Sequence, residues 1–277
     1  MRIYLQIPFR ILLYFWVHHF IFVSCSAPPK KETPVAVEEK PEERRILSQP
    51  QELALLESVD DARSFRSKSD WSEAKYSEFN ESNYSSFPPF LERINVSKQD
   101  SALLGAAIFF ETNKQRKKFG LRPLRYSNVL ENSAFEHSQD MISLGFYSHT
   151  SPVLGKETLK DRLYLFGFNV ADNSKFAENL SDGFALEYSS GVPIFTPEQN
   201  KNDSFSYTKG GAPIQMRTYT DMAAELVTIW MNSPAHRKNI LNPNFFFLGS
   251  SGVYYKDNRF ADIPKVRAAQ VFANREK

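Results

Sequence analysis

The order of periodic segments along the chain restricts its fold more than any other feature. Apolar residues at helical spacing, with glycines where three of the runs stop, predict four helices: 97–119, 127–145, about 157–166 and about 219–232. Two strand candidates come only afterwards, at 245–255 and 266–273, with Asp257-Asn258 as the expected turn region between them. Helices first and a short antiparallel sheet late predict an α+β fold.

The first 24 residues are typical of an export signal. Arg2 and Arg10 precede an apolar run, 11–23, which is shorter than the about 20 residues of a membrane-spanning helix. The run ends at Phe22-Val23-Ser24-Cys25, which resembles the lipobox of a bacterial lipoprotein. The resemblance implies cleavage before Cys25 and attachment of acyl chains such as palmitate to that residue. The protein would then be anchored to a bacterial membrane, in the cell envelope and outside the cytoplasm.

An uncleaved signal anchor from Ile3 to Val23 is the alternative, and Pro8 and Arg10 argue against it. Under either interpretation the rest of the chain leaves the cytoplasm. Cys25 is the only cysteine, so no intrachain disulfide can form, and an exported domain must depend on its hydrophobic core.

Composition and charge limit the classes of function. The chain is 42% hydrophobic and 24% charged, which is ordinary for a protein with a packed core. Its formal net charge is +2, and removal of Arg2 and Arg10 would leave 32 basic and 32 acidic residues. No basic surplus therefore directs the protein to nucleic acid.

Composition also divides the chain. After the signal, residues 26–45 are rich in Pro, Glu and Lys and are predicted to form a disordered tether. Residues 46–97 form an N-terminal extension, which either packs on the following domain or lies between tether and core. The domain is expected at 98–277, with an inserted loop at about 182–217 that is rich in Gly, Ser, Asn and Pro.

Two histidines lie on polar, helix-breaking segments, and these are the candidates for chemistry. His149 lies in 146–152 and His236 in 233–237, while Glu178 lies between them in the chain. Imidazole and carboxylate groups can bind zinc, and a His–Glu pair can equally polarise a water molecule. Either role requires a fold that brings the three together. His137 lies on the apolar face of its helix and is predicted to be a core or boundary histidine.

Taken in order, these landmarks resemble the CAP superfamily (cysteine-rich secretory proteins, antigen 5 and pathogenesis-related proteins) in its bacterial SCP-like form, over about 100–274. The matching segments are 113–116 with 120–124, 134–141, 148–152, 161–163 with 167–168, 177–180, 230–241, 248–249 and 269–272. The resemblance implies an α-β-α sandwich with a small antiparallel sheet between helices. It also implies a cleft that contains His149, Glu178 and His236.

Two departures from the family pattern concern the cleft. Ala177 stands where the family usually has glycine, and Ser233 stands near the place where many relatives have a second glutamate. Glu225 and Ser233 are therefore lesser candidates, and Glu225 is expected on a solvated helix face. No Gly-x-Ser-x-Gly motif surrounds Ser148, Ser151 or Ser233, which disfavours a serine nucleophile.

Three functions fit these observations. The favoured one is a binding or interaction module that takes a lipid, a sterol, or a host or envelope partner through the His/Glu cleft. The alternative is a hydrolase, with or without zinc, acting on peptides or envelope polymers. The sequence lacks His-Glu-x-x-His and offers no obvious third strong ligand, so zinc is weakly supported. In the third, the cleft residues only hold loops in place.

Overall fold

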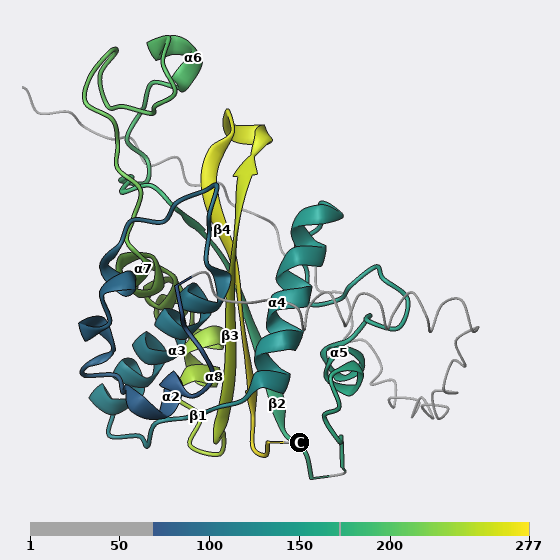
Figure 1. Ribbon diagram of the computed structural model, residues 1–277. Helices are drawn as coiled ribbons and strands as arrows, with labels where there is room; N and C mark the ends of the chain where they lie inside the picture. Colours follow the sequence, from purple (N-terminus) through teal and green to yellow (C-terminus); the bar gives the residue numbers. More distant parts are fainter. Residues whose placement is uncertain (1–68, 172, 277) are drawn as a thin grey trace, which may run out of the picture. The chain divides into compact units, whose positions relative to one another are not determined.

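The computed structural model describes residues 69–171 and 173–276, all within one compact unit of the chain, 46–277. A four-stranded sheet lies between two helical layers, as Figure 1 shows. Helices α3 (Ser101–Lys118), α7 (Tyr219–Asn232) and α8 (Pro234–Ile240) cover one face, and α4 (Asn128–Ser143) and α5 (Leu159–Leu165) cover the other. The predicted α+β class is confirmed.

The sheet has the order β1-β3-β4-β2, which makes β2 an edge strand. Strands β3 and β4 form the antiparallel pair expected late in the chain, β2 pairs antiparallel with β4, and β1 pairs parallel with β3. The strands are β1 (Arg125–Tyr126), β2 (Phe176–Phe184), β3 (Phe247–Asp257) and β4 (Ile263–Ala273). The shorter elements are α2 (Lys75–Glu78), η1 (Tyr84–Ser86), η2 (Pro88–Leu91), α6 (Pro197–Asn200) and η3 (Asn258–Phe260).

Local capping chemistry explains where the helices begin. The first long helix begins after Asp100, whose carboxylate accepts a hydrogen bond from Leu103 N, rather than after Ser97 as the sequence pattern suggested. Thr158 and Asp161 form a reciprocal capping box at the start of α5. Elements as short as α8 carry too little periodicity to be recognised from sequence alone.

Strand β3 passes very close to the helices on both of its faces because it is rich in glycine. A Cβ atom at Gly249 would lie 1.9 Å from the backbone nitrogen of Glu131 in α4. On the other side, a Cβ at Gly105 of α3 would lie 2.4 Å from the carbonyl oxygen of Ser250. Neither position can accept a larger residue unless the backbone moves, so these glycines set the spacing of the three layers.

Each face of the sheet has its own hydrophobic core. One contains Leu104, Trp230 and Phe272 among the residues between α3, α7 and the sheet. The other contains Leu130, Leu163 and Val271 between α4, α5 and the sheet. Successive side chains of β4 point to opposite faces of the sheet, and both faces are covered by helices. All eleven residues of β4 except Lys265 are therefore buried.

The described part of the N-terminal extension packs on the first core instead of standing apart from it. Trp71 is 6% exposed, and its ring lies within 6.0 Å, centroid to centroid, of five aromatic rings: Tyr76, Phe79, Phe87, Phe90 and Phe110. Phe110 belongs to α3, so the cluster joins the extension to the domain. The sequence left open whether the extension packs on the domain or lies between tether and core, and residues 69–97 pack on the domain.

Replacement of Trp71 by alanine tests this arrangement. The change removes the centre of the aromatic cluster, and we expect the free energy of unfolding to fall by about 3–5 kcal/mol. Urea unfolding followed by circular dichroism measures it. The control is Leu91→Ala, because Leu91 is 58% exposed and its loss should cost no more than about 0.5 kcal/mol. Equal effects of the two changes would show that the extension does not contribute to the core.

A buried carboxyl group ties the same extension to the sheet and to α4. Glu131 accepts hydrogen bonds from the phenols of Tyr76 (3.0 Å) and Tyr126 (2.5 Å), whose rings stack with centroids 3.7 Å apart. Burial raises the pKa of Glu131 to about 7, although both phenols favour the charged form. The folded protein therefore holds a proton that the unfolded chain releases near pH 4.5.

This shift has a defined sign in a pH titration. Because the folded pKa is raised, the stabilisation is complete below about pH 4.5 and is lost as the pH rises through about 7. Between pH 4.5 and pH 8, we expect the free energy of unfolding of Glu131→Gln to fall by about 3 kcal/mol less than that of the parent protein, since glutamine stays neutral. Urea unfolding at several pH values measures this. Glu198→Gln, at an exposed position, should leave the pH profile unchanged.

The inserted segment begins only after Phe184, because β2 continues through the first residues predicted to be loop. From there to the start of α7, the chain forms an arm with isolated bridges, such as Phe195 to Ser206, and with the single turn α6. A small core supports the arm: Leu186, Phe205, Ile214 and Ile263. The arm leaves β2 at the end far from Glu178, as Figure 1 shows for α6, so it does not cover that residue.

Several expectations lie outside the described residues: the signal at 1–24, the lipidated Cys25 and the tether at 26–45. No helix in the part of the chain that the structure describes is both long enough and apolar enough to cross a membrane.

Candidate functional site

Glu178 lies at the centre of the candidate site. It stands near the start of the edge strand β2, opposite Val271 of β4, and its side chain is 3% exposed. Its Oε1 atom accepts a hydrogen bond from the Arg162 guanidinium at 2.8 Å, and its Oε2 atom lies 2.9 Å from Nδ1 of His149. Both carboxylate oxygens therefore have partners.

The surroundings of Glu178 favour its charged form. Burial alone would raise the pKa of the carboxyl, but the hydrogen bond from His149 and the positive charge of Arg162 outweigh it. The pKa of Glu178 consequently lies below its ordinary value of 4.5. Since its acid form is disfavoured, the group acts as a fixed negative charge and not as a proton acceptor near neutral pH.

His149 is the accessible member of the pair. Its side chain is 59% exposed, while Nδ1 faces the buried carboxylate. A carboxylate on one ring nitrogen orients the imidazole and leaves Nε2 for a water molecule or a ligand. The family resemblance implied that His149 and Glu178 lie near each other, and in the structure Nδ1 of His149 is in direct contact with the Glu178 carboxylate.

His137 is a core residue, as its position on the apolar helix face predicted, and it also lies beside this cluster. It is fully buried, its Nε2 lies 2.9 Å from the carbonyl oxygen of Ser148, and the same atom is 4.0 Å from Glu178 Oε2. Burial lowers its pKa to about 4, although the charge of Glu178 opposes this. His137 thus stays neutral and holds the start of the loop that carries His149.

Two buried cations hold the rest of that loop. Arg162 donates to the carbonyl oxygens of His149 (3.2 Å) and Lys156 (3.1 Å) in addition to Glu178. The ammonium group of Lys156 lies 2.6 Å from Glu136 and 3.3 Å from Asp140, both on α4. The loop is therefore fixed at several points, which limits the positions available to His149.

His236 reaches the site from the opposite helical layer, on α8. Its backbone carbonyl accepts a hydrogen bond from the amide of Asn179 (3.2 Å), and Asn239 of the same helix donates to Asn179 Oδ1 (2.9 Å). Burial lowers the pKa of His236, and the nearby His149 lowers it further. The amide of Asn239 also lies 3.5 Å from the backbone carbonyl oxygen of Glu178, so the helix that carries His236 packs directly against this part of β2. Nδ1 of His236 is buried and has no hydrogen-bond partner among the described residues.

In the described part of the chain, neither of the two lesser candidates, Glu225 and Ser233, forms a hydrogen bond or ion pair with Glu178 or His149. Glu225 is half-exposed on α7, and its carboxylate lies 3.6 Å from Arg217, which agrees with the expected solvated helix face. Ser233 lies at the junction of α7 and α8, and its side chain makes no capping bond. The hydroxyls of Ser148 and Ser151 accept hydrogen bonds from the backbone nitrogens of Thr150 and Val153.

Zinc finds little support in this arrangement. Within residues 69–171 and 173–276, no three or more His, Cys, Asp or Glu side chains are grouped as a metal site. Arg162 occupies one oxygen of Glu178, and a cation so close to the carboxylate competes with a metal ion. The donor set therefore does not fit a resident zinc ion.

Sequence reasoning did not assign His137 or Lys156 to the site. A histidine in an apolar helical stripe is usually core, and a lysine in a loop is usually exposed. The sequence carried one usable signal: Lys156 and Arg162 flank a capping box, and their charges need acceptors if the loop packs inward. Their partners come from distant elements, so only the fold could identify them.

The low pKa of His137 leads to a prediction about acid stability. The folded protein keeps His137 neutral down to about pH 4, whereas the unfolded chain protonates near pH 6.5, so stability falls as the pH drops through this range. We expect His137→Gln to reduce that fall by about 2–3 kcal/mol. Urea unfolding between pH 7.5 and pH 4 measures the effect. Met141→Leu, on the same buried helix face, should give a curve parallel to the parent, and a parallel curve for His137→Gln would contradict the assignment.

Most of the folded domain matches a known protein family. Residues 109–272 match the family model described as "CAP: Cysteine-rich secretory protein family". The Bacillus subtilis (strain 168) protein YkwD, described as uncharacterized, is 33% identical over 138 residues, which make up 50% of this chain and 38% of YkwD. The uncharacterized membrane protein YlbC of the same strain is 29% identical over 150 residues, 53% of this chain and 31% of YlbC. The chain thus spans about a third of the length of these relatives.

Solved structures give more distant likenesses. An extracellular SCP-domain protein from Bacillus anthracis str. Ames aligns with a TM-score of 0.43 and 25% identity, over 66% of this chain and 45% of that one. An outer surface protein from Borrelia burgdorferi aligns with a TM-score of 0.38 and 18% identity, over 66% of this chain and 98% of that one.

Proposed function

This chain belongs to the CAP family, the cysteine-rich secretory protein family, and from that premise we propose that it is an exported binding module. Its ligand site is the surface formed by His149, Glu178 and His236. The export signal and the lipobox-like segment at Cys25 support a location in the cell envelope, with a lipid anchor to the membrane. The ligand is a lipid, a sterol, or a host or envelope partner with a polar group for the two imidazoles.

The observation that carries this proposal is that both oxygens of the Glu178 carboxylate already have partners. A general base must be able to take a proton, yet Arg162 and His149 hold both oxygens of Glu178 and keep its pKa low. The carboxylate instead positions His149. The buried, unpartnered Nδ1 of His236 supports a binding role, since a polar group of a ligand would satisfy it.

One observation favours hydrolysis as a second candidate. The Glu178–His149 contact at 2.9 Å resembles the carboxylate–imidazole pair of a catalytic base, with Nε2 of His149 available to activate water. The serines beside His149 do not supplement it, because neither hydroxyl has a hydrogen bond to His149 in the described part of the chain, and each accepts one from a backbone nitrogen instead. A hydrolase would therefore have to use water directly.

Native mass spectrometry and a hydrolysis assay on residues 46–277 distinguish the two candidates. For a binding module, we expect a noncovalent adduct in the purified protein that the double variant His149→Ala/His236→Ala loses, and no hydrolysis of casein or peptidoglycan. Glu225→Gln is the matched control and should keep the adduct, because its side chain lies away from the site.

The opposite outcomes are equally specific. Hydrolysis of casein or peptidoglycan that disappears in the double variant would contradict a purely binding role and support the hydrolase. A stoichiometric zinc ion that the same variant loses would point in the same direction. An adduct that survives in the double variant would place the binding surface elsewhere on the protein.

A further inference from the structure

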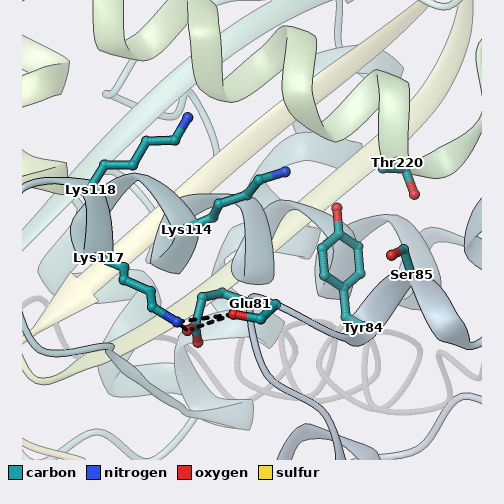
Figure 2. A pocket seen from close by; sticks show the side chains of 8 residues that line it. Glu81, Tyr84, Ser85, Lys114, Lys117, Lys118 and Thr220 are labelled. Atoms are coloured by element: carbon teal, nitrogen blue, oxygen red, sulfur yellow. Dashed lines mark hydrogen bonds and ion pairs between the residues drawn. The ribbon is translucent and has the colours of Figure 1, made fainter.

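A hollow of about 320 Å³ lies between the last turns of α3 and the N-terminal segment, and the beginning of α7 contributes to its wall (Figure 2). Three lysines of α3, Lys114, Lys117 and Lys118, line it together with Glu81. Four hydroxyl-bearing residues complete the lining: Ser82, Tyr84, Ser85 and Thr220. None of these residues belongs to the surface around Glu178, so the hollow is a separate feature.

The three lysines have different roles in the hollow. Lys117 is engaged, because its ammonium group lies 2.7 Å from Glu81 and 3.0 Å from the Ser82 hydroxyl. Lys114 contacts the buried Glu111 at 2.8 Å, its side chain is 46% exposed, and two N–H donors of its ammonium group remain after the bond to Glu111. Lys118 is exposed and forms no hydrogen bond or ion pair with the other described residues. Two cations are therefore available to a ligand.

The hollow carries an excess of positive charge. Three ammonium groups lie near two carboxylates, Glu81 and the buried Glu111, so one positive charge is left over. Lysines are common in the last turn of a helix because they complement its dipole, and this explains their presence at the end of α3. It does not explain a concave wall of hydroxyls supplied by two other segments.

Those hydroxyls add directed polar groups to the charge. Tyr84 donates to Glu111 and Thr220 donates to the carbonyl oxygen of Phe90, so each oxygen can still accept a hydrogen bond. The Ser85 hydroxyl has no hydrogen-bond partner in the described part of the chain and can donate. Figure 2 shows these three side chains at one end of the hollow, with the lysines extending from α3.

We propose that this hollow binds a phosphate-bearing group. Lys114 and Lys118 contact the phosphate oxygens, and Ser85 donates a hydrogen bond to the same group, because charge-assisted donors are the strongest partners of phosphate. The remaining hydroxyls, from Tyr84 and Thr220, accept hydrogen bonds from polar atoms next to the phosphate. Lys117 remains paired with Glu81 and supports the wall.

A titration of the full chain in maltoside micelles, which contain no phosphorus, tests the proposal. Glycerol phosphate is the free probe, and phosphatidic acid added to the micelles is the lipid probe; phosphorus NMR follows both. We expect saturable binding that Lys114→Gln/Lys118→Gln weakens about tenfold. Saturation by glycerol phosphate identifies a free phosphate ligand, and saturation only by phosphatidic acid identifies a lipid headgroup.

Two controls keep the result specific. Lys98→Gln/Lys256→Gln removes the same two charges at exposed positions outside the hollow and should leave the affinity within about twofold, since remote exposed charges are screened. Glu81→Gln should tighten binding, because it removes a carboxylate and frees Lys117. Circular dichroism verifies that each variant is folded. Failure of both probes to saturate, or equal weakening by the two lysine pairs, would overturn the proposal.

Discussion

The buried ion pair between Arg162 and Glu178 is the interaction on which the arrangement of the site depends. Their side chains are 0% and 3% exposed, so neither charge is compensated by water. Further hydrogen bonds support such a pair: here His149 contacts the carboxylate and two loop carbonyls accept from the guanidinium, while Nε of Arg162 has no hydrogen-bond partner among the described residues. Removal of one partner from a buried pair costs about 3–5 kcal/mol, because the other charge is left alone. The edge strand, α5 and the His149 loop are therefore one energetic unit.

The alternation of side chains along β2 extends this unit across the sheet. Glu178 points to the layer of α4 and α5, and the next residue, Asn179, points to the layer of α8. His149 contacts Glu178 from one layer, and the backbone of His236 contacts Asn179 from the other, so the two histidine segments meet neighbouring residues of this edge strand. The close approach of β3 to α3 and α4 through Gly105 and Gly249 keeps those layers at a fixed distance.

The helices could be predicted because their information is local. The apolar periodicity and the glycines that end three of the runs lie within or beside each segment and do not need distant partners. Strand β2 was not predicted, since Phe176–Phe184 contains Glu178, Asn179 and Ser181 at buried positions. Those polar residues are stable inside only because distant partners, such as Arg162 and Gln270, satisfy them.

The sequence by itself determined the fold class, the order of the helices, the late antiparallel pair and three candidate residues, because periodicity, helix-ending glycines and motif order are properties of the chain alone. Only the tertiary structure decided what those residues do. It showed that Arg162 forms an ion pair with Glu178 and that His137 and Lys156 hold the loop that carries His149. It also showed that His236 lies on α8, in the helical layer on the other face of the sheet. Burial and charge compensation arise between residues far apart in the chain, and they decide whether a carboxylate takes up a proton or holds a fixed charge.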